Sequence, residues 1–181
     1  MVKLDIGCGK NKREGFIGID QFPMDGVDIV IDVRSEQLGY ENNSVDEINA
    51  SHFLEHLTAK ERVFLLNEFY RLLKPGGTVT IVTPHWASNR AYGDFTHQWP
   101  PVSEMFYYYL SKKWRDSNAP HTDIEYNPEG YACDFQATWG YSYNPELNSR
   151  HQEHIQFALA NYKEVILDMV ATLTKPSIVE D

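Results

Sequence analysis

The sequence predicts an α/β fold built around an open, mostly parallel sheet. In the first half of the chain, short β-branched apolar runs alternate with glycine or carboxylate residues at their carboxyl ends. One strongly periodic helix follows the fourth of these runs, and a fifth run comes directly after that helix. Strands separated in this way gather in one sheet, and a helical crossover makes the strands that it joins parallel.

The first three strands are predicted at 2–6, 16–19 and 27–31, where each run is brief and β-branched, as in buried parallel strands. The connections "KNKREG" and "QFPMDG" offer about six residues each, whereas a parallel crossover commonly takes about a dozen or more. The helices of these connections are therefore predicted to be trimmed. One face of the sheet would then lack its cover, and exposed apolar surface is unfavourable in water. We expect aromatic segments of the second half, or the second subunit of a homodimer, to cover it.

The fourth strand is predicted at 45–50, after the turn signal "ENNS". Thr58, with Glu61 three residues later, forms a capping-box pattern that marks the start of a helix. The sequence "KPGG" predicts the end of this helix, and a fifth strand follows at 78–84. The apolar residues of the helix recur at helical spacing and are Val63, Leu66, Phe69, Tyr70 and Leu73.

The second half is rich in Trp, Tyr, Pro and His from residue 85 to 121, with one helix predicted near 103–110. Residues 131–143 alternate between apolar or aromatic and small or polar side chains, which is the period of a strand with one buried face. Residues 168–175 alternate again and are predicted to close the sheet at an edge. Between these strands a helix is predicted whose buried face comprises Ile155, Ala158, Leu159, Tyr162, Val165 and Ile166.

The composition argues against several kinds of partner. The chain has 181 residues and a formal net charge of −10, with no basic cluster beyond short pairs such as Lys112-Lys113, so nucleic acid is not expected as a substrate. No run approaches the ~20 apolar residues of a membrane span, and the N-terminus carries no signal-peptide pattern, so no membrane partner is expected. Cys8 and Cys133 lie in apolar contexts, which favours free thiols in a reducing cytoplasm.

The residues at the strand ends predict a cofactor site at one edge of the sheet. In "LDIGCGKNKREGFIGID", Gly7 and Gly9 allow the backbone to approach a ligand closely. Asp5 can accept from an ammonium group, and Asp20 can accept from two ribose hydroxyls. The other strand ends carry Asp32 for an adenine amino group, Val33 for the adenine ring, and Ser51 and His52 on the same edge.

With these groups in order, the chain resembles the class I S-adenosylmethionine (SAM)-dependent methyltransferases, near the small methyltransferase type 11 group, over about residues 1–84. The resemblance is carried by "LDIGCGK", "GID", "DIVIDV", "SVDEINASHFLEHL" and "FYRLLKPGGTVTIVTP", although the third glycine of the usual loop reads Asn11. It implies SAM as the cofactor and a single Rossmann-like domain, 1–181, with a SAM-binding core (1–84), an acceptor-side insertion (85–130) and closing strands and helix (131–181). By the resemblance, Asp5, Gly7 and Gly9 line the methionine portion, Asp20 the ribose, Asp32 and Val33 the adenine, and Ser51 and His52 the sulfonium side, with Cys8 and Gln21 in the same site.

The implied reaction moves the sulfonium methyl group of SAM to a small-molecule acceptor. Because the methyl carbon is already activated, alignment of the acceptor can supply much of the catalysis. A base is needed only where the nucleophile arrives protonated, and His97 with Asp94, in the loop after the fifth strand, is the first candidate. His52 and His85 come next. The competing interpretation is a catalytically silent module that binds SAM or S-adenosylhomocysteine (SAH) and regulates or scaffolds a partner.

Three further patterns in the sequence suggest other functions. A nicotinamide-binding loop expects a third glycine at the start of a helix, which "GCGKNK" lacks. "HFLEH" formally matches a zinc-peptidase pattern, although its place after a strand suits capping and packing. A metal ion held by His85, Asp94, His97 and His121 stays open as an alternative, but no residue is assigned as a metal ligand.

Overall fold

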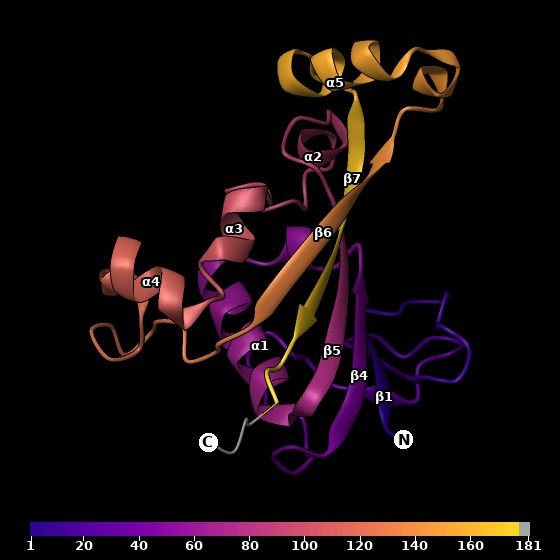
Figure 1. Ribbon diagram of the computed structural model, residues 1–181. Coiled ribbons are helices and arrows are strands. Elements are labelled where there is room, and N and C mark those ends of the chain that lie inside the picture. The colour runs from indigo at the N-terminus through magenta and orange to yellow at the C-terminus, as the bar shows by residue number, and fades with distance from the viewer. Residues whose placement is uncertain (178–181) are drawn as a thin grey trace.

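The computed structural model describes residues 1–177, and within them seven strands form one sheet (Figure 1). They are β1 (Lys3–Ile6), β2 (Ile17–Asp20), β3 (Ile29–Val30), β4 (Val45–Ser51), β5 (Leu73–Pro84), β6 (Gln136–Tyr143) and β7 (Ile166–Thr174). The spatial order is β3-β2-β1-β4-β5-β7-β6. β1 to β5 pair in parallel, while β7 runs antiparallel to both of its neighbours. The predicted α/β fold with a mostly parallel sheet is confirmed.

Within the described residues, the connections from β1 to β2 and from β2 to β3 contain no helix, so the predicted trimming of the crossovers is confirmed. These two connections pass close to each other beside Gly18. The Gly18 N–H donates to Asp28 Oδ2 at 2.7 Å, and a Cβ on Gly18 would lie 2.4 Å from the Gly26 carbonyl oxygen. Glycine at position 18 is therefore what lets the two short connections share this space. β3 is reduced to two residues, shorter than predicted.

The helix α1 (Ala59–Leu72) starts where the local sequence predicts it. The Glu61 N–H donates to Thr58 Oγ1 at 3.4 Å, and the Thr58 N–H donates to Glu61 Oε2 at 2.7 Å, which is the predicted capping box. The helix ends before the predicted "KPGG" stop, because Leu73 already pairs with Val45 in the sheet. The end of this helix is thus set by a tertiary contact rather than by the proline and glycines.

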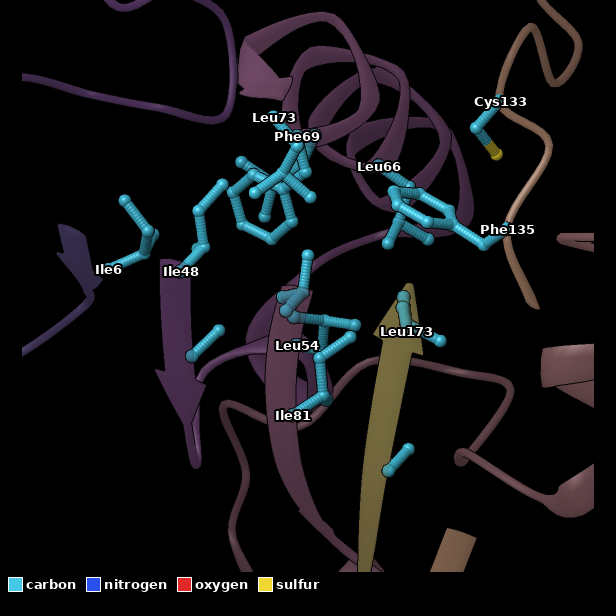
Figure 2. Close-up of a cluster of buried hydrophobic side chains, with 14 of the residues drawn as sticks. Ile6, Ile48, Leu54, Leu66, Phe69, Leu73, Ile81, Cys133, Phe135 and Leu173 are labelled. Carbon is cyan, nitrogen blue, oxygen red and sulfur yellow. The ribbon is translucent and has the colours of Figure 1, made fainter. Parts of the chain in front are cut away.

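The two faces of the sheet differ in polarity because successive side chains of a strand point to opposite faces. On one face, which we call the apolar face, a row of paired positions crosses six strands. This row comprises Ile17, Leu4, Ile48, Val79, Leu173 and Ala137. The adjacent row, on the polar face, comprises Gly18, Asp5, Asn49, Thr80, Thr172 and Thr138. Figure 2 shows α1 over the apolar face, where Ile48 and Phe69 meet in the buried core.

The expectation that aromatic segments of the second half cover the trimmed face was wrong. α3 (Glu104–Tyr108) and α4 (Lys112–Asn118) lie on the same side of the sheet as α1 (Figure 1), and Phe135 belongs to the same core as that helix. The reason is that the trimmed face is mostly polar and therefore needs little cover, although Val30 and Val170 are exposed on it. The homodimer remains a prediction, but the need to cover an apolar face no longer supports it.

The second half departs from the prediction at three places. β6 begins at Gln136 instead of residue 131, although Cys133 and Phe135 upstream of it are buried as the alternation predicts. β7 lies between β5 and β6 and is an interior strand, not the predicted edge, because both of its sides find partners. α5 (Gln152–Asn161) ends before Val165 and Ile166, and Ile166 instead begins β7, where it pairs with Tyr143. The shorter described elements are α2 (Arg90–Gly93), η1 (Leu54–His56), η2 (Pro120–Thr122) and η3 (Pro145–Ser149).

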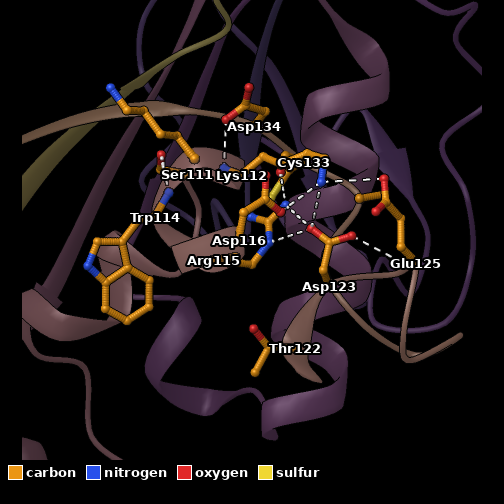
Figure 3. Close-up of polar contacts among 12 residues, drawn as sticks. Ser111, Lys112, Trp114, Arg115, Asp116, Thr122, Asp123, Glu125, Cys133 and Asp134 are labelled. Atoms are coloured by element: carbon orange, nitrogen blue, oxygen red, sulfur yellow. Dashed lines mark hydrogen bonds and ion pairs between the residues drawn. The ribbon is translucent and has the colours of Figure 1, made fainter. Parts of the chain in front are cut away.

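A buried ion pair ties the segment between β5 and β6 together (Figure 3). Arg115 and Asp123 are 0% and 1% exposed, and Arg115 Nε donates to Asp123 Oδ2 at 2.9 Å. The remaining nitrogens of the guanidinium donate to the carbonyls of Tyr109 and Cys133, each at 2.8 Å. One side chain thus joins α4, the segment after η2, the end of α3 and the approach to β6.

Both cysteines are free thiols in the described structure, as predicted. Cys133 is buried and Cys8 is half-buried, and burial raises the pKa of each thiol. None of the helices within residues 1–177 is long and apolar enough to cross a membrane.

Candidate functional site

Two adjoining cavities open at the carboxyl edge of the parallel strands, where open α/β sheets bind ligands. The Asp20 cavity, of about 280 Å³, is lined by Gly7, Asp20, Gln21, Phe22, Met24, Ile31, Asp32, Val33, Arg34, His52, Phe53 and His56. The Asp5 cavity, of about 340 Å³, is lined by Asp5, Gly7, Cys8, Gly9, Lys10, Asn11, Asn49, Ser51 and His52. Every residue predicted for the cofactor therefore lines one of these cavities, and the shared residues Gly7 and His52 join the two.

The loop after β1 has the backbone shape that its glycines permit. Gly7 and Gly9 have positive φ values of 65° and 50°. A Cβ on Gly7 would lie 2.3 Å from Phe53 Cδ2, whereas a Cβ on Gly9 would meet nothing within 4 Å. Gly7 therefore allows Phe53 to pack against the loop, while Gly9 keeps the backbone open toward the Asp5 cavity.

Two carboxylates hold this loop in place. Asp5 is nearly buried and accepts from the Arg13 N–H at 2.7 Å and from Asn49 Nδ2 at 2.6 Å. Asp20 accepts from the Gly9 N–H at 3.0 Å and from the Phe22 N–H at 3.0 Å. Both side chains thus support the loop and also line a cavity, so replacing either one acts on the site and on the loop together.

Asp32 is held by an arginine that the sequence analysis missed. Arg34 donates to both carboxylate oxygens of Asp32 at 2.7 Å, and its Nη2 also donates to Gln21 Oε1 at 2.8 Å. These hydrogen bonds lower the pKa of the Asp32 carboxyl. An adenine amino group would have to share the carboxylate with Arg34. The spacing of two residues in "DVR" was the one sequence signal for this pair.

Other lining residues were also missed. Phe22, Met24, Ile31, Phe53 and His56 give the Asp20 cavity an aromatic and apolar wall. Lys10, Asn11 and Asn49 add polar groups to the Asp5 cavity. Phe22 is 59% exposed although it is aromatic, and its place two residues after the end of β2 was the signal that could have found it.

His52 stands where the two cavities meet. Its backbone has a positive φ of 53°, and its Nδ1 lies 3.2 Å from Glu55 Oε1. This hydrogen bond to Glu55 raises the pKa of His52. Because η1 is a single 3-10 turn and begins after His52, "HFLEH" does not form the helix on which a zinc-peptidase pattern relies.

The predicted His97–Asp94 pair is not a hydrogen-bonded dyad. His97 Nε2 and Asp94 Oδ2 are 4.0 Å apart, and Asp94 Oδ1 accepts instead from the Thr96 N–H and hydroxyl at 2.8 and 2.7 Å. His97 lies against His56, with 4.8 Å between the ring centroids. Because His56 lines the Asp20 cavity, His97 lies one residue behind the wall of that cavity.

His85 belongs to a different environment. It is 2% exposed, its Nε2 lies 2.9 Å from Glu104 Oε1, and its Nδ1 accepts from the Ala87 N–H at 3.2 Å. Both ring nitrogens are therefore occupied, and His85 lines a separate cavity with Trp86 and Tyr141. The metal set of His85, Asp94, His97 and His121 is not assembled: among the described residues, the group close enough to share an ion is Glu55, His56 and His97.

Comparisons with known proteins support the fold described above. Residues 19–81 match the family model of a methyltransferase domain. A SAM-dependent methyltransferase from Archaeoglobus fulgidus has a similar structure, with a TM-score of 0.66 and 22% identity over 96% of this chain and 85% of that chain. A chain in a complex of the Haloferax volcanii Trm112 methyltransferase activator has a TM-score of 0.58 and 14% identity, covering 99% and 84%. The [4+2]-cyclase SpnF has a TM-score of 0.51 and 16% identity, covering 97% and 74%.

No curated protein sequence matches the chain. The predicted resemblance to the class I SAM-dependent methyltransferases of type 11 is confirmed by the family match and by the shared fold. SAM is the cofactor of the class that this chain resembles. The likeness to a cyclase shows that this fold carries more than one chemistry.

Proposed function

We propose that this chain is a SAM-dependent methyltransferase that acts on a small-molecule acceptor. One observation carries the proposal: the residues predicted for SAM all line two cavities that share Gly7 and His52. These cavities offer a carboxylate for ribose hydroxyls at Asp20, an aromatic surface at Phe22, and a second carboxylate for a cationic amino group at Asp5.

The residues present fit SAM, whose sulfonium supplies the activated methyl group when it is bound. Gly9 leaves room for the methionine portion, and His52 lies beside the place where the two parts of the cofactor would join. The net charge of −10 and the aromatic second half favour a neutral or cationic acceptor with apolar parts. Alignment of that acceptor with the methyl group would then supply much of the catalysis.

Calorimetric titration with SAH tests the cofactor site, with NAD as the control ligand. We expect SAH to bind and Asp20→Ala to weaken binding by about 10- to 100-fold, because it removes charge-assisted hydrogen bonds. Asp25→Ala, in the same connection but exposed and outside both cavities, should bind SAH as the wild type does. Absence of SAH binding to the wild type would contradict the proposal.

The silent SAM- or SAH-binding module remains the second candidate, and the 4.0 Å separation of His97 and Asp94 favours it over an enzyme with that dyad. Formation of SAH from SAM with a panel of small amines, phenols and carboxylic acids separates the two. An enzyme should produce SAH with one class, and His97→Gln should lower that turnover while SAH affinity is kept. SAH binding without turnover across the panel would support the silent module.

A further inference from the structure

Three side chains beside the Asp20 cavity bring metal-ligand atoms together. One carboxylate oxygen of Glu55 and one ring nitrogen each of His56 and His97 lie within 4.8 Å of one another. Glu55 and His56 are consecutive residues of η1, whereas His97 comes from the loop after α2. Tertiary folding assembles this group, and it differs from every set that the sequence suggested.

The hydrogen bonds of His56 show which of its nitrogens is free. Its Nδ1 lies 2.8 Å from Thr96 Oγ1, and the Thr96 hydroxyl already donates its proton to Asp94 Oδ1 at 2.7 Å. Thr96 Oγ1 must therefore accept from the Nδ1–H of His56, which leaves Nε2 with a free lone pair. Asp94, proposed from sequence as the partner of His97, instead orients His56 through Thr96.

His97 has the same arrangement. Its Nδ1 lies 3.2 Å from the Ala91 carbonyl, which can only accept, so the neutral ring keeps a lone pair on Nε2. Metal-ligating histidines typically donate their other ring N–H to a carbonyl, carboxylate or similar acceptor, and both histidines do so here.

Glu55 supplies an independent observation. The residue is 5% exposed, and its Oε1 lies 3.2 Å from His52 Nδ1. Its Oε2 is buried and has no hydrogen-bond partner in the part of the chain that the structure describes. A buried carboxylate oxygen without a partner is costly, and a cation would satisfy it.

We propose that Glu55, His56 and His97 bind one Zn²⁺ ion. Two imidazole nitrogens and one carboxylate oxygen are a ligand set that Zn²⁺ takes in sites with an open fourth position. Ligand atoms that share zinc lie roughly 3–3.5 Å apart, so the two half-buried histidines have to turn slightly inward. His56 also lines the Asp20 cavity, so the open position lies beside the space assigned to SAM, where it would hold an acceptor oxygen or nitrogen. This last role rests on the proposed function.

Titration of chelator-treated protein with Zn²⁺ by calorimetry, and with Co²⁺ by its visible d–d absorption, tests the site. We expect one ion per chain. His97→Gln and Glu55→Gln should each weaken Zn²⁺ binding by about tenfold or more, since even changes behind the ligands have effects of that size. His121→Gln, an exposed histidine on η2 outside the group, is the matched control and should bind as the wild type does.

Thermal unfolding shows whether a variant has lost the metal site or has failed to fold. Zn²⁺ should raise the Tm of the wild type and of His121→Gln more than that of His97→Gln, whose metal-free Tm should match the wild type. Absence of stoichiometric binding to the wild type would overturn the proposal. Wild-type affinity in both ligand variants would also overturn it, because the ion would then sit elsewhere, for example on the exposed pair His151 and His154. Neither titration contains SAM or an acceptor, so failure here and failure of the proposed function are distinguishable.

Discussion

Glu104 is the residue on which three side chains of the second half converge. His85 Nε2 and the Tyr141 hydroxyl lie 2.9 Å from its Oε1, and Trp86 Nε1 donates to its Oε2 at 3.3 Å. These contacts join the segment after β5 to α3 and β6. The hydrogen bond from His85 is the main cause that lowers the pKa of Glu104 from 4.5 to about 2.

This shift predicts a dependence of stability on pH. The pKa of Glu104 is lower in the folded state than in the unfolded state. Its contribution to the stability of the fold is therefore fully present above about pH 4.5 and is lost as the pH falls toward 2. Glu104→Gln should lower the free energy of unfolding by about 1–2 kcal/mol at pH 7. Near pH 3, the difference in free energy of unfolding between this variant and the wild type should be smaller. Urea denaturation at several pH values measures this, and parallel profiles for the two proteins would contradict it.

At the scale of elements, the segment between β5 and β6 depends on Arg115 and Asp123. Arg115→Met leaves the carboxylate of Asp123 buried without its partner and should lower the free energy of unfolding by about 3–5 kcal/mol. The double variant Arg115→Met/Asp123→Leu should recover part of this loss, because no buried charge is left alone. Urea denaturation measures both.

Lys112→Met is the control for this prediction. Lys112 lies 3.9 Å from Asp123, but its side chain is partly exposed, so the change should cost less than about 1 kcal/mol. If Arg115→Met were as mild as this control, the ion pair would not anchor the segment.

The elements that could be predicted from sequence are those whose signals are local. The capping box at Thr58 needs four consecutive residues, and the strand ends at Asp5 and Asp20 follow from the order of strands along the chain. The interior position of β7 depends on pairing between distant segments, which alternation does not specify. Glu55 could not be predicted for the same reason, because His97 joins it only when the loop after α2 meets η1. Arg34 is different, because it lies two residues from Asp32 and its contact with that carboxylate is local.

At the scale of the whole molecule, we expect the polar face of the sheet to tolerate substitutions that introduce a charge. Thr172 lies on that face in β7, between β5 and the edge strand β6, and is paired with Thr80 and Thr138. Thr172→Lys should change the free energy of unfolding by no more than about 0.5 kcal/mol and leave the molar mass in solution unchanged. Leu173→Lys, one position along and facing the core, should prevent stable folding because it buries a charge.

Urea denaturation and light scattering measure these outcomes. A wild-type dimer that Thr172→Lys dissociates would show that a second subunit covers the polar face. A loss of more than about 2 kcal/mol in a chain of unchanged mass would show that another part of the chain packs there.

The alternation of polar and apolar rows also determines how the strands can pair. A slip of one residue between β1 and β4 would turn Asp5 toward α1 and its apolar neighbours toward water. In a parallel sheet that is apolar on both faces, such a slip exchanges one apolar side chain for another and is weakly opposed. In this chain, a slip of any strand except β3, which consists of Ile29 and Val30, would bury a carboxylate, an amide or a hydroxyl. Mispairing of β1 and β2 is therefore disfavoured although no crossover helix joins these two strands.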